Sequence, residues 1–317
     1  MGLNAAGGTE QEGVALLSRN DIYYYVLGDG AVAAGGAFAG IPSFVKQTEL
    51  VTAITAAQVK WLFVAPEFLD LALATVQIQG PGKPDSTTVI VFDPPGLEPY
   101  RGSHPSLRKI MNVADESLFL NPNEGKDPIF RTAFRLFTSG TTGSVKAAEI
   151  SHATQLARID HNFCPSPHVG RALQIIGMYH ISGLMPSCRA CLGKSTLYVS
   201  TTEDAATVLD RIQSLGITSA MLPPRIMAAI ADIINRGWRP LETLQSLRFV
   251  TFGGALCRKE IIEAFTRFLP SHASLICSYG STESGPISAA ACNTQWTIGN
   301  VGFPAPGVEV KYVTTPH

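Results

Sequence analysis

Charged side chains are scarce in this sequence, and no run of one sign occurs. Of 317 residues, only 15% are Asp, Glu, Lys or Arg, and the net charge is −1, whereas globular domains average about 25% charged residues. Nucleic acids and anionic membranes bind clustered Lys and Arg, so the sequence predicts no nucleic-acid partner. The 45% of hydrophobic residues supply a large core, and the length suits one large α/β unit or two ordinary domains.

Long apolar runs and targeting signals are also lacking. The most apolar segment, residues 22–42, carries Asp29 and several glycines, so we interpret it as a buried helix and turn and expect no membrane span. No signal peptide is recognisable at Met1, and Ala6 stands where an N-myristoylation site needs Ser or Thr. We therefore expect a cytoplasmic protein.

Cysteine is too infrequent for a disulfide framework, with six residues in the whole chain. Cys188 and Cys191 form one C-x-x-C, but a zinc site needs a second pair or nearby histidines, and a redox motif needs a thioredoxin-like setting. Neither is visible, so we predict two packed cysteines in a helix.

What the sequence does contain is an alternation of apolar strands and helices, which is typical of parallel βαβ units. We expect an α/β fold of two packed, mostly parallel sheets with surrounding helices. The pattern predicts a first helix that ends at the glycines of residues 35–40, and a long surface loop at 94–127. Predicted strands are 14–18, 60–64, 88–92, 133–137, 172–176, 195–199, 218–222, 247–252 and 274–277. Predicted helices are 23–32, 67–75, 153–163, 182–192, 204–215, 224–235 and 258–268, with another starting at Thr48.

The stretch from Leu136 to His152, LFTSGTTGSVKAAEISH, is the most informative. An apolar strand runs into small and hydroxylated residues, and a single lysine, Lys146, follows. Glycines let backbone N–H groups converge, hydroxyls add donors and lysine adds positive charge, which together suit a phosphate. The alternative is a surface turn. We favour the phosphate cradle because the loop directly follows a buried strand and ends in one lysine, without a second strand.

Two common nucleotide motifs do not fit this stretch. A Walker loop needs four residues between its glycines and Ser or Thr after the lysine, whereas two residues separate Gly140 and Gly143, and Ala147 follows Lys146. The G-x-G-x-x-G of a dinucleotide-binding fold is also missing.

Three further loops follow predicted strands, where ligands bind in parallel sheets. Residues 253–256 contain a glycine pair, which permits close approach of a flat group or only a tight turn. Residues 278–283 offer an aromatic ring, a hydroxyl and the carboxylate of Glu283. One glutamate near phosphates is enough to bind Mg²⁺. However, a single acidic residue in such a loop more often belongs to a surface turn, with its side chain in solvent. In residues 178–184, His180 lies among apolar residues and has no nearby nucleophile pattern, so packing is its simplest role.

Taken in order, these four segments resemble the adenylate-forming superfamily, which includes acyl-CoA synthetases, 4-coumarate–CoA ligases, luciferases and adenylation domains of peptide synthetases. The family loop T-S-G-T-T-G-x-P-K-G is matched except at Val145 and Ala147. Residues 179–184, 253–256 and 279–283 match the aromatic-His-x-x-Gly-Leu, Gly-Gly-Ala and Tyr-Gly-x-Thr-Glu segments. Residues 301–310 match the run that enters the small β-barrel of the family. The acyl-CoA synthetase and 4-coumarate–CoA ligase branch is the most similar.

The resemblance implies a role for each matched residue. Lys146 would bind the ATP phosphates, Thr282 would touch them, Glu283 would hold Mg²⁺, and His180 would border the pocket of an aryl or fatty carboxylic acid. These four form the expected catalytic set, and the acid would be converted to an acyl-adenylate. The phosphate cradle would be Thr138, Ser139, Gly140, Thr141, Thr142, Gly143 and Lys146, and the adenine site Gly253, Gly254, Ala255, Ser278, Tyr279 and Gly280.

Residues 10–165 and 166–288 would form two α/β subdomains, and residues 289–317 part of the β-barrel. The small C-terminal lid domain of the family, with its late lysine, has no counterpart before His317. We therefore expect the N-terminal core of a ligase, which in a full-length relative would also take CoA and which here would need a lid in trans or a homo-oligomer. The alternative is a module that binds nucleotide or an acyl ligand without full ligase activity.

Overall fold

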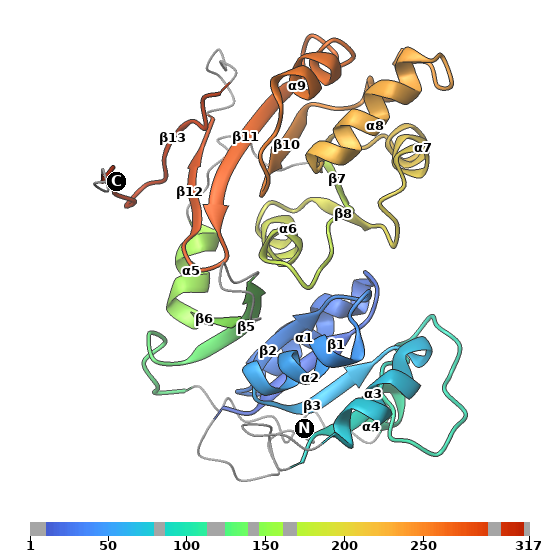
Figure 1. Ribbon diagram of the computed structural model, residues 1–317, viewed down its shortest axis with the longest axis vertical. Coiled ribbons are helices and arrows are strands. Elements are labelled where there is room, and N and C mark those ends of the chain that lie inside the picture. Colours follow the sequence, from blue (N-terminus) through green and yellow to red (C-terminus); the bar gives the residue numbers. More distant parts are fainter. Residues whose placement is uncertain are drawn as a thin grey trace. The chain divides into compact units, whose positions relative to one another are not determined.

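The chain forms two compact units. The computed structural model describes residues 11–78, 86–112, 124–138, 146–160, 170–290 and 299–313 (Figure 1). Unit 1 comprises residues 1–156 and 177–184, and unit 2 comprises residues 157–176 and 185–317. The chain therefore passes from one unit to the other at 156/157, 176/177 and 184/185.

Unit 1 contains a six-stranded sheet in the order β4-β3-β1-β2-β5-β6. Neighbouring strands are parallel from β4 to β5, and β6 is antiparallel to β5. Its strands are β1 Gly13–Leu17, β2 Ala37–Ile41, β3 Val59–Val64, β4 Thr88–Val91, β5 Thr132–Thr138 and β6 Lys146–Ser151. The associated helices are α1 Ile22–Ala33, α2 Gln47–Ala56, the short 3₁₀ helix η2 Pro66–Phe68, α3 Leu69–Val76, α4 Leu107–Asn112 and α5 His152–Asp160.

Helices cover both faces of this sheet, as the alternation of side chains along β2 shows. Phe38 points to the face covered by α1, where its ring meets Tyr24 edge-on at 5.8 Å. Ala39 and Ile41 point to the other face and belong to the apolar cluster that includes Leu50 of α2. Because successive strand residues face opposite sides, β2 is buried on both, as its fully buried pattern confirms.

Strand β2 was not predicted from the sequence. Gly35, Gly36 and Gly40 were interpreted as the end of a helix, but α1 ends at Ala33 and a turn with Gly35 at φ 86° leads straight into the strand. Gly40 lies inside that strand because a side chain there has no space: a β-carbon would be 2.5 Å from Cα of Tyr179 and 2.4 Å from Oη of Tyr24.

The described part of residues 94–127, predicted as a surface loop, is tied to the end of β4. The buried carboxylate of Asp93 accepts hydrogen bonds from the backbone N–H groups of Tyr100 at 3.1 Å and Arg108 at 3.0 Å. The Arg108 side chain, in α4, donates to the carbonyls of Pro94 and Leu97, both at 2.8 Å. These side-chain bonds fix the segment in place of the backbone hydrogen bonds of a regular helix or strand.

Unit 2 contains a seven-stranded sheet in the order β13-β12-β11-β10-β9-β7-β8. The strands from β8 to β11 are parallel, and β11, β12 and β13 pair antiparallel. Its strands are β7 Arg171–Gln174, β8 Thr196–Val199, β9 Ser219–Met221, β10 Phe249–Gly253, β11 Ser274–Ser281, β12 Gly285–Ala289 and β13 Phe303–Pro304. The helices are α6 Ile181–Leu192, which begins in unit 1, α7 Ala205–Leu215, α8 Pro224–Asn235, the 3₁₀ helix η4 Leu241–Leu244 and α9 Lys259–Thr266.

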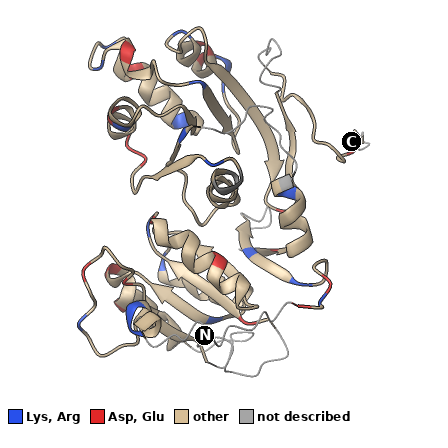
Figure 2. Cartoon of the chain, turned by 180° about the vertical axis from the view of Figure 1, so that it is seen from behind, with Lys and Arg blue, Asp and Glu red and all other residues tan. Residues whose placement is uncertain are grey.

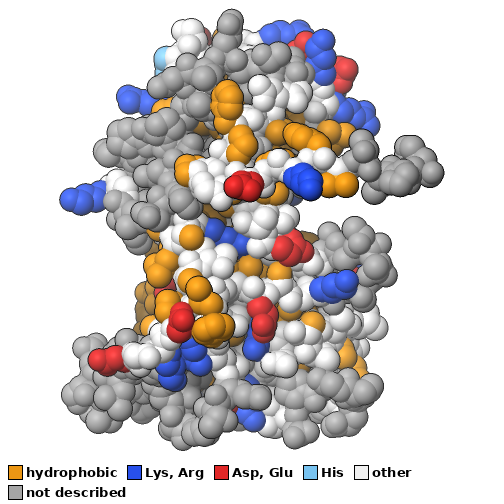
Figure 3. Space-filling view, turned by 90° about the vertical axis from the view of Figure 1, so that its left-hand side faces the viewer, with side chains coloured by type: hydrophobic (Ala, Val, Ile, Leu, Met, Phe, Trp, Pro, Cys, Tyr) orange, Lys and Arg blue, Asp and Glu red, His pale blue; other side chains and the backbone are white. Residues whose placement is uncertain are grey.

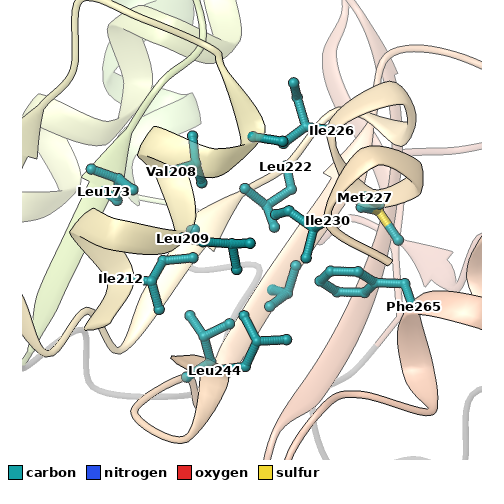
Figure 4. Close-up of a cluster of buried hydrophobic side chains, with 14 of the residues drawn as sticks. Leu173, Val208, Leu209, Ile212, Leu222, Ile226, Met227, Ile230, Leu244 and Phe265 are labelled. Carbon is teal, nitrogen blue, oxygen red and sulfur yellow. The ribbon is translucent and has the colours of Figure 1, made fainter. Parts of the chain in front are cut away.

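Three helices of unit 2 share one core with the sheet. Leu209 of α7, Ile230 of α8 and Phe265 of α9 are fully buried in one cluster (Figure 4). Val250 of β10 belongs to the same cluster. Burying one such side chain contributes about 1.5–3 kcal/mol before the entropy of folding is deducted.

The two ends of α7 are explained by its sequence. At the start, the side chain of Asp204 accepts a hydrogen bond from the N–H of Thr207, and at the end, the next residue after the helix is a glycine in the left-handed region.

Charged groups are dispersed over both units (Figure 2). On the face drawn in Figure 3, acidic and basic side chains of the described residues are interspersed with apolar ones. This agrees with the near-zero net charge. In the part of the chain that the structure describes, no helix has both the length and the apolar character needed to cross a bilayer.

Candidate functional site

The predicted phosphate loop joins two paired strands. Thr138, the last residue of β5, lies directly opposite Lys146, the first residue of β6. The expectation that no second strand follows the loop was therefore wrong. The sequence after the lysine, KAAEIS, has few β-branched residues, and its strand conformation comes from pairing with β5. The five cradle residues between them, Ser139, Gly140, Thr141, Thr142 and Gly143, lie outside the described residues.

The hairpin that bears this loop is fixed by Arg135 in the middle of β5. The residue as a whole is only 6% exposed. It donates to Oε1 of Glu149 on β6 at 3.1 Å and to the carbonyl of Ala57, at the end of α2, at 3.0 Å. These bonds join β5, β6 and α2. Lys146 itself is exposed at the end of the hairpin, where its ammonium group is available to a ligand.

In unit 2, two of the predicted adenine-site segments lie side by side. Gly253 at the end of β10 is paired with Ser278 on β11. A β-carbon on Gly253 would be 2.3 Å from the Ser278 carbonyl oxygen, so only glycine permits this approach. The Ser278 hydroxyl donates to the carbonyl of Phe252 at 3.2 Å. Gly254 and Ala255 follow as exposed residues at the carboxyl end of the strand, which is where ligands bind in parallel sheets.

Residues 278–281, predicted as loop, are the last part of strand β11. The polar sequence concealed this because β12, which was not predicted, pairs with them: Tyr279 lies opposite Ser288 and Gly280 opposite Pro286. Tyr279 is 54% exposed, so part of this residue is accessible to a ligand. Thr282 and Glu283 form the turn between β11 and β12, with the Glu283 side chain exposed.

The turn is held by Arg158, a residue that the sequence analysis missed. Its Nη2 donates to the carbonyl of Thr282 at 2.9 Å and to the carbonyl of Glu283 at 3.0 Å. The residue is only 5% exposed, and this burial lowers the pKa of its guanidinium, which nevertheless stays charged. An arginine near the end of a polar helix is expected to face solvent. The sequence therefore contains no signal for the contact between Arg158 and the turn.

His180 lies just before α6, in the segment of residues 177–184 that belongs to unit 1. Its Nδ1 accepts a hydrogen bond from the backbone N–H of Ser182 at 3.2 Å. Burial lowers the pKa of the imidazole, which therefore favours the neutral form with its proton on Nε2. His180 thus offers one N–H donor without a full charge, which suits the border of a carboxylate pocket.

Contacts inside unit 1 fix the segment that bears His180. The Tyr25 hydroxyl donates to the Gly183 carbonyl at 2.6 Å, and the Asn20 side chain accepts from the Met178 N–H at 2.9 Å. The close approach of Tyr179 to Gly40 adds a third constraint. The backbone around His180 is therefore positioned by β2 and α1.

The structure groups the predicted site residues in two sets. Thr138, Lys146 and His180 belong to unit 1, and the residues of 253–255, 278–280, Thr282 and Glu283 belong to unit 2. Within the described ranges, no cluster of three or more His, Cys, Asp or Glu side chains is present. Glu283 is therefore a single exposed carboxylate. This fits Mg²⁺ bound together with nucleotide phosphates, which takes only one or two carboxylates from the protein.

Comparison with known proteins agrees with this arrangement. Residues 1–316 match the family model "AMP-binding enzyme". A phenylacetyl-CoA ligase of Aspergillus niger is 27% identical over 321 residues, which cover 99% of this chain and 58% of that protein. An acyl-CoA ligase of the same species is also 27% identical over 321 residues, covering 99% and 59%. The chain thus spans less than two thirds of the length of these curated relatives.

Solved structures share the fold. The luciferase-like enzyme of the nonluminescent mealworm Zophobas morio has a TM-score of 0.79 at 21% identity, over 96% of this chain and 69% of that one. ATP-bound MatB of Rhodopseudomonas palustris has a TM-score of 0.74 at 23% identity, over 96% and 56%. The two α/β sheets, the order of the four segments and the match over residues 1–316 together show that this chain belongs to the family of AMP-binding enzymes.

Proposed function

We propose that this chain is the part of an acid–CoA ligase that binds ATP and a carboxylic acid and forms the acyl-adenylate. The observation that carries the proposal is the pairing of Thr138 with an exposed Lys146 at the two ends of a Gly/Ser/Thr-rich loop. A lysine ammonium fixed there supplies positive charge to phosphates without blocking the backbone N–H groups of the loop.

In the proposed step, a carboxylate oxygen of the acid attacks the α-phosphorus of ATP. The bond between that phosphorus and the bridging oxygen breaks, and pyrophosphate leaves with the electron pair. No proton is transferred and nothing is oxidised, so the protein needs no nucleophile or redox group. Orientation of the two substrates and stabilisation of phosphate charge supply the acceleration.

Each site residue has a role that fits its surroundings. Lys146 and the loop between 138 and 146 bind the phosphates. The adenine base lies against the backbone of 253–255, and the ring of Tyr279, a residue that is 54% exposed, stacks on the base. The neutral imidazole of His180 donates from Nε2 towards the acid. Glu283 would hold Mg²⁺, which would neutralise phosphate charge.

The relatives suggest the class of acid. The names of two curated relatives specify phenylacetyl-CoA and acyl-CoA ligases, which supports an aryl or fatty acid as substrate and CoA as the acceptor of the full-length protein. A lid domain in trans, self-association and a cytoplasmic location, all expected from the sequence, belong to the same proposal.

The alternative, a module that binds nucleotide or an acyl ligand without activating an acid, had two motives: the late lysine of the family, which has no counterpart among these residues, and the departures at Val145 and Ala147. Ala147 sits in regular strand β6 opposite Phe137. Among the described non-glycine residues, only Gln58 and Lys194 have positive φ, so position 147 does not demand glycine. Val145 lies outside the described residues. The departure at 147 therefore gives the alternative no support.

ATP–pyrophosphate exchange with a panel of aryl and fatty acids tests the proposal. We expect exchange that depends on acid and on Mg²⁺ and that falls in Lys146→Ala. Lys60→Ala is the matched control, because Lys60 bonds only Ser86 Oγ among the described residues. It lies near the amino end of β3, whereas the phosphate loop follows the carboxyl end of β5, which runs parallel to β3 in the same sheet. If no acid gives exchange above the Lys146→Ala level, the activation step is refuted. ATP binding measured by calorimetry then decides whether the binding module remains.

A further inference from the structure

Arg158 makes an unusual contact with the turn between β11 and β12. One atom, Nη2, donates to two successive backbone carbonyls, those of Thr282 at 2.9 Å and Glu283 at 3.0 Å. Figure 1 shows the end of α5 beside this turn. Because the acceptors are main-chain atoms, the bonds fix the path of the turn, and the exposed Glu283 carboxylate is left available. In the described part of the chain, no ion pair involves that carboxylate.

The turn is shaped to the guanidinium. Gly285, directly after it, has φ +73°, and a β-carbon there would be 2.6 Å from Nε of Arg158 and 3.2 Å from its Cδ. Positive φ is a conformation that glycine adopts without strain. The arginine and the glycine therefore fit together closely, and a side chain at 285 would displace Arg158 from its two carbonyl partners.

Stability alone does not explain why an arginine occupies position 158. Its Nε and Nη1 are buried and have no hydrogen-bond partner among the residues that the structure describes. Burying donors of a charged group without partners is unfavourable, and such groups in a fold call for an explanation. The two bonds of Nη2 provide one: they hold the backbone on which Thr282 and Glu283 are presented.

We propose that Arg158 is a positioning residue that fixes the Thr282–Glu283 turn, so that the Glu283 carboxylate meets a divalent cation bound to nucleotide phosphates. This inference rests on the proposed function of Glu283. Arg158 touches neither substrate nor metal in it and acts through the two carbonyls.

Two measurements on the full chain test the role of Arg158. The first is hydrogen exchange of backbone amides at residues 281–285, followed by mass spectrometry in Arg158→Ala and Arg158→Lys. We expect faster exchange in both, because lysine retains the charge but not the planar fork. The second is calorimetric ATP affinity with and without Mg²⁺. We expect the gain in ATP affinity that Mg²⁺ provides to fall by at least about tenfold in both variants, and the affinity in EDTA to fall by a smaller factor, because only the Thr282 contact is then affected.

Controls separate this role from general damage and from failure of the proposed function. Arg171→Ala removes another arginine that donates to a backbone carbonyl, that of Leu215 at 2.7 Å, and should leave both readouts at wild-type values. Glu283→Gln should abolish the Mg²⁺ gain without changing exchange in the turn as Arg158→Ala does. If Arg158→Ala does not fold, Arg158→Lys, which keeps the buried charge, replaces it.

The outcomes are distinct. The inference is overturned if folded Arg158 variants keep wild-type exchange at 281–285. It is also overturned if they keep the full Mg²⁺ gain while Glu283→Gln loses it. If the wild-type protein binds no ATP, the proposed function fails by itself, and the exchange measurement alone still decides whether Arg158 holds the turn.

Discussion

Gly253 and Ser278 lie so close that a β-carbon at residue 253 would stand 2.3 Å from the Ser278 carbonyl oxygen and 2.5 Å from its hydroxyl oxygen. The two residues are register partners on parallel strands β10 and β11. The backbone contact places two segments of the proposed adenine site, distant in sequence, at one edge of one sheet.

Gly253→Ala should therefore damage both stability and nucleotide binding. We expect a loss of about 1–3 kcal/mol in the free energy of unfolding, because the strands must separate to admit the methyl group. Urea unfolding and ATP calorimetry measure the two effects. Gly30→Ala is the matched control. Gly30 is an exposed residue within α1, and a β-carbon there would meet nothing within 4 Å, so this substitution should stabilise the fold by about 0.5–1 kcal/mol. Equal stability for the two variants would contradict the packing argument.

Lys146→Ala should weaken ATP binding without changing stability. Lys146 is exposed at the first position of β6, so its removal leaves no cavity and no unpaired buried group. A charge-assisted hydrogen bond to phosphate contributes about 1.5–3 kcal/mol, which corresponds to about 10–100-fold in the dissociation constant measured by calorimetry. An unchanged dissociation constant would show that Lys146 does not contact the ATP phosphates.

Arg135 and Glu149 form one ion pair, but truncating them should have unequal effects. The Arg135 side chain is 8% exposed and that of Glu149 is 61% exposed. Arg135→Ala leaves the Ala57 carbonyl without its 3.0 Å partner, and we expect a cost of about 1–3 kcal/mol. Glu149→Ala should cost less than Arg135→Ala: the lost carboxylate is largely solvated, and Arg135, although its Nε loses a partner, keeps its bond to the Ala57 carbonyl. Urea unfolding of both variants checks this, and equal costs would show that the pair acts as a unit.

Stability should fall as the solution is acidified through the range in which free histidine titrates. Burial lowers the pKa values of His180 and His152 below the usual 6.5, and nearby Arg131 lowers that of His152 further. The unfolded chain then binds more protons than the folded one below about pH 6.5, so the contribution of these groups is present at higher pH and is lost on acidification.

Thermal unfolding at pH 7.5 and pH 5.5 measures this dependence. His180→Asn keeps an acceptor near the Ser182 N–H but cannot be protonated. The midpoint of this variant should therefore depend less on pH than that of the wild type, and adding His152→Asn should flatten the dependence further. If both variants retain the wild-type difference between the two pH values, the titrating groups lie elsewhere.

The parts of the fold that the sequence predicts are those with a local cause. Helix α8 was predicted with its observed bounds because Pro224 suits the first helical position, and α7 because Asp204 caps it. Strand β2 was not predicted because its glycines conceal it and one of its partners, β5, lies about ninety residues further along the chain. Strands β6 and β12 were not predicted because each takes its strand conformation from antiparallel pairing with the strand that precedes it, β5 or β11. Gly40 is the clearest case: it was interpreted as a breaker, yet it lies in a buried strand to admit Tyr179.

The same division applies to the candidate site. The segments with glycines, hydroxyls and single charges could be proposed as site residues from the sequence because their chemistry is local. Arg158 could not, because its role depends on two carbonyl groups 124 and 125 residues further along the chain. No periodicity distinguishes that arginine from others on a polar helix face.

Unit 1 is interrupted in the chain, and this constrains how the protein folds during synthesis. Residues 177–184 complete unit 1, yet they follow residues 157–176 of unit 2. Until residue 184 has emerged from the ribosome, the Tyr25 hydroxyl lacks its Gly183 partner and Gly40 faces no Tyr179. The amino-terminal half therefore cannot finish folding before translation has passed β7, and its apolar surface stays open to chaperones for that interval.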